Sequence, residues 1–120
     1  MKTSITIAAN FSAAHRLPEH EGKCCRLHGH TYSLEVTVAG IPQESGPAKG
    51  MVMDFADLRQ RVGELILEPL DHLLLIEVFD FVPTVEAVAA WIFSRLEDAG
   101  LPVVRVQLAE GPNTYVEVTA

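Results

Sequence analysis

The segment Thr31–Ala39 alternates apolar and polar residues without interruption, and this pattern constrains the fold more than any other feature. The apolar residues are Tyr32, Leu34, Val36 and Val38. Because neighbouring side chains of a strand point to opposite faces, the alternation predicts a β-strand with one buried face. His28 and His30 precede the segment in the same phase. If the strand extends back to them without a bulge, both imidazoles point toward the buried face.

The remaining periodicities predict three more strands and two helices. The strands are expected at Thr3–Phe11, Val103–Ala109 and Tyr115–Thr119. One helix begins after the N-cap Asp54 and ends at Pro69, and its apolar stripe comprises Phe55, Leu58, Val62, Leu65 and Ile66. The other begins after the N-cap Thr84 and ends at Gly100, with the stripe Val85, Val88, Ala89, Ile92 and Leu96. The order strand-strand-helix-helix-strand-strand predicts an α+β fold, in which two helices cover one face of a four-stranded antiparallel sheet. Residues 1–120 are expected to form one domain.

Composition narrows the class of protein. The formal net charge of −7, from 9 Lys and Arg against 16 Asp and Glu, argues against a nucleic-acid partner. No uncharged apolar run approaches the roughly 18 residues that cross a bilayer, and the N-terminus does not resemble a signal peptide. We therefore expect a cytoplasmic protein without a membrane partner. The adjacent Cys24 and Cys25 would be strained as a disulfide, so both are expected to be thiols. Strand pairing at the open sheet edges predicts a homo-oligomer.

A third histidine has the phase needed to join His28 and His30. His15 follows Ile5, Ile7 and Phe11 at odd positions of the first strand. Three nitrogen ligands with an open fourth position are the arrangement of a catalytic zinc ion, so the three histidines predict a Zn²⁺ site. The alternative is a set of unrelated, hydrogen-bonded core histidines.

Acid–base candidates lie in two other segments. Cys24 stands beside Lys23 and Arg26, whose charges and a nearby metal would favour the thiolate, which could act as base or nucleophile. The alternative is an inert buried thiol. The pair Asp71 and His72 follows the end of the first helix, where a carboxylate and an imidazole could form a general acid. Such pairs also occur by chance.

Glu110 is the last candidate. It continues the predicted buried row of Val104, Val106 and Leu108. A carboxylate there is costly unless paired, and it could hold a ligand through two neighbouring N–H donors. The alternative is a solvated strand end before a turn.

These residues together resemble the 6-pyruvoyl-tetrahydropterin synthase family over nearly the whole chain. The matching motifs are Phe11–His15, Cys24–His30, Gly50–Phe55, Leu70–His72, Pro83–Glu86 and Glu110. The three residues between Cys24 and His28 resemble the 6-carboxy-tetrahydropterin synthase branch of queuosine biosynthesis. The resemblance implies the tunnelling fold, in which sheets join edge to edge, with trimers stacked into a hexamer.

The resemblance also implies a reaction and a role for each matched residue. The substrate would be 7,8-dihydroneopterin triphosphate, and the products 6-carboxy-tetrahydropterin, acetaldehyde and triphosphate. His15, His28 and His30 would bind zinc, Cys24 would be the base, and Asp71 with His72 the proton relay. Glu110 would anchor the pterin ring. Thr84 and Glu86 of the matched motif would bind substrate, and Arg16, Lys23 and Arg26 would hold part of the triphosphate.

Three positions depart from the family pattern. Ile76 and Ala87 replace asparagines that commonly follow two of the motifs, and Gly111 replaces a Thr or Ser after the glutamate. None of these removes a zinc ligand or an acid–base residue. One alternative activity is 6-pyruvoyl-tetrahydropterin synthesis, which retains the side-chain carbons. Another, from a different class, is a non-catalytic zinc- or pterin-binding module.

Overall fold

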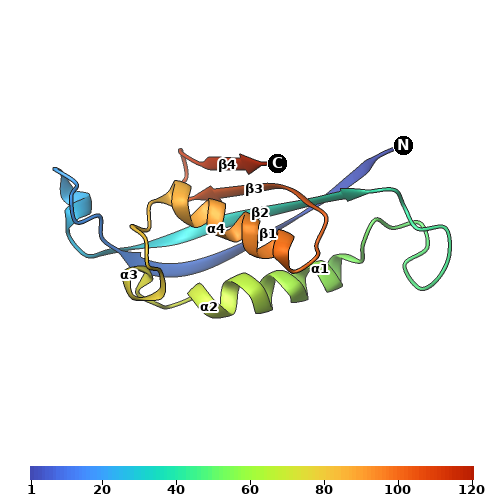
Figure 1. Ribbon diagram of the computed structural model, residues 1–120, viewed down its shortest axis with the longest axis horizontal. Helices are drawn as coiled ribbons and strands as arrows, with labels where there is room; N and C mark the ends of the chain where they lie inside the picture. The colour runs from blue at the N-terminus through green and yellow to red at the C-terminus, as the bar shows by residue number, and fades with distance from the viewer.

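A computed structural model describes residues 1–120 and contains a single antiparallel sheet of order β1-β2-β3-β4 (Figure 1). The strands are β1 (Thr3–His15), β2 (His28–Gly40), β3 (Val103–Ala109) and β4 (Val116–Thr119). The helical segments are η1 (Lys23–Cys25), α1 (Phe55–Val62), η2 (Gly63–Leu67), α2 (Glu68–Leu70), α3 (Leu75–Val78) and α4 (Val85–Asp98). The predicted order of strands and long helices is confirmed. No helix has the length and apolar character needed to cross a membrane.

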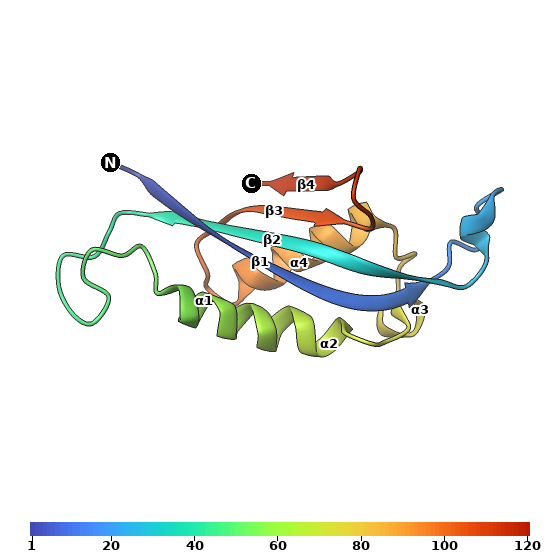
Figure 2. The ribbon, with the colours of Figure 1, turned by 180° about the vertical axis from the view of Figure 1, so that it is seen from behind.

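The long hairpin of β1 and β2 organises the molecule. The two strands pair over their full length, from Thr3 opposite Gly40 to His15 opposite His28. They extend beyond the helices in both directions, and the molecule measures 54 × 24 × 23 Å (Figure 2). On the inner face the paired positions place Ile7 against Val36 and Phe11 against Tyr32, whose rings stack. The predicted alternation of β2 is therefore confirmed, and it extends without a bulge to His28 and His30 at the start of the strand.

Both long helices cover this inner face, so the sheet has one apolar and one polar side. A single core joins the strands to the buried residues Leu58, Val62 and Ile66 of the first helical run and Val88, Ile92 and Leu96 of α4. The opposite face carries Arg105, whose guanidinium pairs with Glu117 and lies 3.5 Å from Glu35. The helices thus bury one side of the sheet while the other remains polar.

Several details differ from the expectations. β1 extends to His15, and the short segments η1 and α3 were not predicted. Val104 is only half-buried, because a β-bulge between Thr37 and Val38 places Val103 in the inner row instead. Phe55, the first residue of α1, is 56% exposed. These differences depend on strand pairing and helix placement, which periodicity does not specify.

The first helical run continues through Pro69 instead of ending there. Proline has no N–H to donate to the carbonyl four residues earlier, which here belongs to Leu65. The chain widens into the π-helix η2 just before Pro69, and the Leu65 carbonyl accepts a hydrogen bond of 2.6 Å from Nε of Arg95 on α4. Arg95 also lies over the ring of Trp91. A side chain from the second helix therefore satisfies the acceptor that proline leaves free.

We expect Arg95→Ala to lower the free energy of unfolding by about 1 kcal/mol, the usual net value of one hydrogen bond. In a Pro69→Ala background, residue 69 regains an N–H for the Leu65 carbonyl, so the same substitution should cost less. Urea unfolding of the four proteins in this double-mutant cycle gives the coupling directly. An equal loss of unfolding free energy in both backgrounds would contradict the role given to the hydrogen bond between Arg95 and the Leu65 carbonyl.

Candidate functional site

Three histidines meet at the end of the β1–β2 hairpin, on the inner face of the sheet. His15 pairs directly with His28, and His30 pairs with Ala13, two residues before His15. Because residues two apart on a strand share a face, all three imidazoles point to the same side. Their ligand atoms all lie within 4.8 Å of one another, and we call these residues the His triad. The strand phases in the sequence had predicted this convergence.

Hydrogen bonds on the outer nitrogens determine which nitrogens face the centre of the triad. Nδ1 of His15 lies 2.7 Å from the Pro83 carbonyl, and Nδ1 of His28 lies 2.7 Å from the Arg26 carbonyl. A carbonyl only accepts, so both Nδ1 atoms carry the proton and donate it. In the neutral imidazoles, Nε2 is then left with a free lone pair. The inner nitrogens of His15 and His28 are therefore ready to act as ligands.

The spacing of these nitrogens fits a metal ion. Nε2 of His15 lies 3.1 Å from Nε2 of His28 and 3.1 Å from Nε2 of His30. Two nitrogens bound to one tetrahedral zinc are about 3.3 Å apart, given Zn–N distances of about 2.0–2.1 Å. Since His15 and His28 present unprotonated nitrogens to each other, no proton is available to bond them directly. A cation between them would convert this repulsion into attraction, so the His triad could bind a metal ion.

Burial acts on two ionisable groups of this region, His30 and Tyr32. His15 is only 1% exposed, and burial lowers the pKa of His30, an effect that the nearby charge of Glu110 partly offsets. The neighbouring Tyr32 is fully buried, and its pKa is raised by burial and by the same carboxylate. Burial therefore favours an uncharged His30 imidazole and an uncharged Tyr32 phenol.

Glu110 faces the open side of the triad. It follows the last residue of β3, Ala109, which pairs with Ser33, so Glu110 comes next to Tyr32. Its two carboxylate oxygens lie 3.7 Å from Nε2 of His15 and 3.7 Å from Nε2 of His30. A cavity of about 70 Å³ beside Glu110 is lined also by Val85 and Tyr115. The carboxylate thus lies close to both the centre of the His triad and this cavity.

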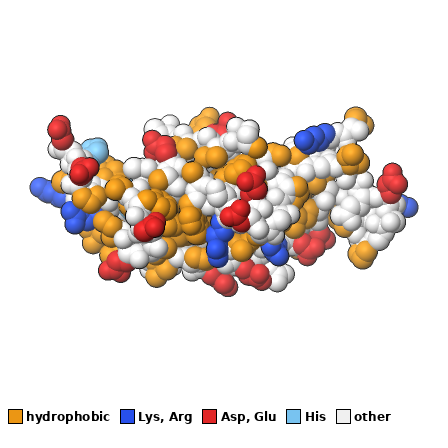
Figure 3. Space-filling view, viewed as in Figure 1, with side chains coloured by type: hydrophobic (Ala, Val, Ile, Leu, Met, Phe, Trp, Pro, Cys, Tyr) orange, Lys and Arg blue, Asp and Glu red, His pale blue; other side chains and the backbone are white.

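Cys24 lies at the tip of the hairpin, in η1, and is half-buried. Its backbone carbonyl accepts a hydrogen bond of 2.6 Å from the N–H of Leu17. The ligand atoms of the metal-binding group are those of the three histidines alone. The side chains of Arg16, Lys23 and Arg26 are exposed, and Figure 3 shows Lys and Arg side chains gathered at this end of the molecule. The structure therefore leaves these cations accessible to a ligand.

Asp71 and His72 lie at the outer edge of β1 and do not contact the triad. The Ser12 N–H donates to Oδ1 of Asp71 at 2.9 Å, and the His72 N–H donates to the Ser12 carbonyl at 2.6 Å. The other carboxylate oxygen, Oδ2, lies 3.0 Å from Nδ1 of His72. His72 has a φ of 61°, a left-handed conformation that non-glycine residues rarely adopt. The hydrogen bonds to β1 hold the pair in this strained turn.

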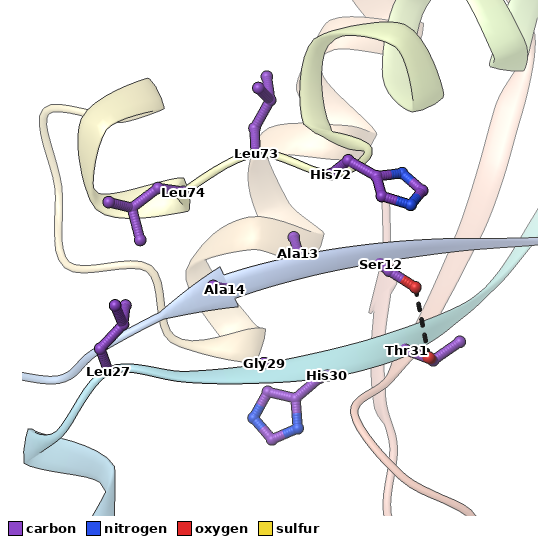
Figure 4. A pocket seen from close by; sticks show the side chains of 10 residues that line it. All are labelled: Ser12, Ala13, Ala14, Leu27, Gly29, His30, Thr31, His72, Leu73 and Leu74. Atoms are coloured by element: carbon purple, nitrogen blue, oxygen red, sulfur yellow. Dashed lines mark hydrogen bonds between the residues drawn. The ribbon is translucent and has the colours of Figure 1, made fainter.

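An open cavity of about 630 Å³ adjoins this edge (Figure 4). One side of the cavity is lined by His72, Leu73 and Leu74, which lie along β1, and the other side by Leu27 and by His30 of β2. Ser12 of β1 and Thr31 of β2 lie between the two sides. The imidazole of His30 points away from His72 in this view. His72 therefore lies beyond the outer edge of β1, and the His30 ring lies on the other side of the two strands in this view.

The other predicted substrate-binding residues are at the start of α4. The Thr84 hydroxyl accepts the Ala87 N–H and caps the helix, as predicted for an N-cap, while Glu86 is exposed in the first turn. Sequence reasoning missed the contributions of Pro83, Ser12 and Tyr32. Pro83 and Ser12 act through backbone groups, which leave no signal in residue type. Tyr32 was assigned to the core, and its position two residues after His30 could have placed it beside the triad.

The whole chain was compared with known proteins. Residues 4–120 match the model of the family described as 6-pyruvoyl tetrahydropterin synthase. The chain belongs to this family. Among its relatives in the 6-pyruvoyl tetrahydropterin synthase family is the 6-carboxy-5,6,7,8-tetrahydropterin synthase of Synechocystis sp., which is 48% identical over 95 residues. That alignment covers 78% of this chain and 74% of the relative.

Two further comparisons bear on fold and activity. The dihydroneopterin monophosphate aldolase of Pyrococcus furiosus is 39% identical over 121 residues, covering 98% of each chain. The solved 6-pyruvoyl tetrahydropterin synthase of Caenorhabditis elegans overlays with a TM-score of 0.86 and 28% identity, covering 100% of this chain and 96% of that one. The tunnelling fold implied by the sequence motifs is thereby confirmed. Relatives with different names share this fold, so family membership alone leaves the reaction open.

We expect the attachment of residues 71–74 to β1 to weaken only under strongly acidic conditions. The hydrogen bond from the Ser12 N–H, foremost, lowers the pKa of Asp71 below its ordinary value. A group whose pKa is lower in the folded state adds stability above its unfolded pKa, and this is lost as pH falls through the folded pKa. An NMR titration should therefore show the Asp71 carboxyl and the Ser12 amide changing together below the ordinary aspartate range. Asp71→Asn should abolish that transition at Ser12. A midpoint at or above the ordinary value would contradict the assignment.

Proposed function

We propose that this protein is a zinc-dependent 6-carboxy-5,6,7,8-tetrahydropterin synthase. It would convert 7,8-dihydroneopterin triphosphate and water into 6-carboxy-tetrahydropterin, acetaldehyde and triphosphate, for queuosine biosynthesis. The observation that carries the proposal is the convergence of the three Nε2 atoms next to Glu110, in a chain 48% identical to a relative bearing that name. Nitrogen-only ligands with tetrahedral spacing favour Zn²⁺.

The His triad and Glu110 would bind and orient the substrate. A bound Zn²⁺ supplies Lewis acidity, which polarises the side-chain oxygens of the substrate and makes neighbouring C–H protons easier to remove. Glu110 would anchor the pterin by accepting hydrogen bonds from two N–H groups of its ring. Thr84 and Glu86 would contact the same ring. Because the Glu110 carboxylate lies 3.7 Å from two of the triad nitrogens, the anchored ring would place its side chain beside the metal.

Acid–base catalysis would be divided between Cys24 and the Asp71–His72 pair. Asp71 holds Nδ1 of His72 at 3.0 Å, which directs Nε2 of that ring outward for proton transfer. Cys24 would remove a substrate proton on the other side. The exposed Arg16, Lys23 and Arg26 would hold the triphosphate until it leaves.

The position of His72 supports an assembly of several chains. The His72 N–H bonds to Ser12, which lies three residues, or about 10 Å, before His15 along the strand. Figure 4 also shows the His30 ring pointing away from His72. We therefore propose that a second copy supplies the Asp71–His72 pair to each triad. Strand pairing between open edges would form the oligomer, a hexamer of two stacked trimers by analogy with the family. Sedimentation of an active monomer would contradict this arrangement.

Incubation of the zinc-loaded protein with 7,8-dihydroneopterin triphosphate tests the proposed reaction. We expect acetaldehyde, triphosphate and 6-carboxy-tetrahydropterin in equal amounts, identified by mass spectrometry and an aldehyde-trapping reagent. A pyruvoyl pterin without acetaldehyde would instead establish 6-pyruvoyl-tetrahydropterin synthesis. Ligand binding with no turnover would establish a non-catalytic binding module. Dihydroneopterin monophosphate as a second substrate would reveal an aldolase activity like that named for the Pyrococcus furiosus relative.

The adjacent cysteines offer a matched pair of variants. Cys24→Ala should lower turnover by roughly 10²–10⁴-fold, the usual cost of losing a positioned acid–base group. Its zinc content should remain at one ion per chain, because the thiol is not a ligand. Cys25→Ala should cost little in either respect. Turnover and zinc stoichiometry are measured for both, and loss of zinc in Cys24→Ala, or loss of activity in Cys25→Ala, would show the roles to be wrong.

A further inference from the structure

The start of α4 touches the His triad through a single backbone carbonyl. The Pro83 carbonyl accepts the hydrogen bond of 2.7 Å from Nδ1 of His15, 68 residues away in sequence. We propose that the capped N-terminus of α4, through Thr84 and Pro83, is a positioning element that holds His15 ready to bind metal. The inference rests on the proposed metal site and assigns a role beyond substrate binding to this segment.

Local bonds leave the Pro83 carbonyl little freedom. The Thr84 N–H donates to the Val82 carbonyl at 2.9 Å, which closes a tight turn around Pro83, and the proline ring restricts the backbone further. On the other side, the Thr84 hydroxyl accepts the Ala87 N–H at 3.1 Å, and the Thr84 carbonyl accepts the Val88 N–H at 3.0 Å. The carbonyl that faces His15 is therefore fixed by a turn before it and a helix cap after it.

His15 depends on this distant acceptor more than His28 depends on its own. It is the buried member of the triad, so water cannot replace a lost partner of its Nδ1–H. His28, by contrast, bonds to the Arg26 carbonyl two residues away in its own hairpin. The only other polar neighbour of Nδ1 in His15 is the Tyr32 hydroxyl, at the longer distance of 3.5 Å.

Loss of the helix cap would weaken metal binding by changing the tautomer of His15. If the first turn of α4 frays, the Pro83 carbonyl moves and no longer requires a proton on Nδ1. His15 can then carry its proton on Nε2 or rotate, and either change removes a lone pair from the centre of the triad. Loss of the Thr84 hydroxyl should therefore weaken metal binding although that hydroxyl does not touch the site.

Thr84→Ala removes the cap, and the chain provides a matched control. Asp54 is the N-cap of α1, where its side chain accepts the Ala56 N–H at 2.7 Å, and it has no bond to the triad. Asp54→Ala should therefore weaken a helix start without affecting metal binding. Thr84→Ser keeps the accepting hydroxyl and should bind Zn²⁺ as tightly as the unaltered protein does. Zn²⁺ affinity is measured by competition with a chromophoric chelator, and the absorption spectrum of the Co²⁺-loaded protein reports ligand geometry.

We expect Thr84→Ala to lower Zn²⁺ affinity by about 10-fold or more, in line with the usual effect of losing a group that orients a ligand. Its Co²⁺ spectrum should also change, while Asp54→Ala and Thr84→Ser keep both properties. Unchanged affinity in Thr84→Ala, or an equal loss in Asp54→Ala, would overturn the proposal. A metal-binding protein without turnover would overturn the proposed reaction and leave this inference standing.

A second measurement needs no substitution. In the metal-free protein, ¹⁵N NMR of the histidine rings should show the His15 proton on Nδ1, in slow exchange with water. A proton on Nε2 of His15 would overturn the proposal even if Thr84→Ala failed to fold.

Discussion

The pairing register of β1 and β2 is the constraint on which the site depends. Thirteen consecutive pairs align the hairpin from Thr3–Gly40 to His15–His28. A shift of one residue would turn one strand's inner side chains to the solvent face. That shift would expose Phe11 or Tyr32 and separate His15 from His28 at once. The stacked pair Phe11–Tyr32, buried beside the triad, therefore ties the stability of the core to the geometry of the histidines.

The electrostatics of the triad follow from its place at the end of the core. Burial favours a neutral His30, and the hydrogen bonds from Nδ1 of His15 and His28 leave the lone pairs of their Nε2 atoms directed into the triad. These lone pairs attract a cation, and without a cation they repel one another. The nearby carboxylate of Glu110 adds a negative charge that further favours a cation. In the proposed function the same carboxylate would also anchor the pterin ring, and this would couple substrate binding to the charge at the metal.

The edge of β1 is divided into a covered part and an open part. Residues 71–74 follow Ser12 to Ala14 through hydrogen bonds and a parallel bridge, and the Arg59 guanidinium donates to the Ala8 carbonyl. The rest of the outer edge of β1, toward Thr3, has no backbone hydrogen-bond partner in the chain. Because the covering segment carries Asp71 and His72, this pair is fixed to the outer edge of the hairpin that bears the triad on its inner face. The proposal that a second copy supplies this pair to each triad rests on that separation.

Much of this arrangement was predictable from periodicity alone. The phases of β1 and β2 predicted that His15, His28 and His30 share a face, and the caps Asp54 and Thr84 marked the starts of both long helices. These signals are local, because each strand face and each helix start depends on a few neighbouring residues. The tertiary structure decided what depends on distant contacts: the continuation of the helix through Pro69 needs Arg95 from α4, and the bulge that displaces Val104 needs β2. It also decided that Asp71 bonds to Ser12 away from the triad, and that the Pro83 carbonyl orients His15. Backbone groups make the last two contacts, and every residue carries the same backbone groups, so residue type could not reveal them.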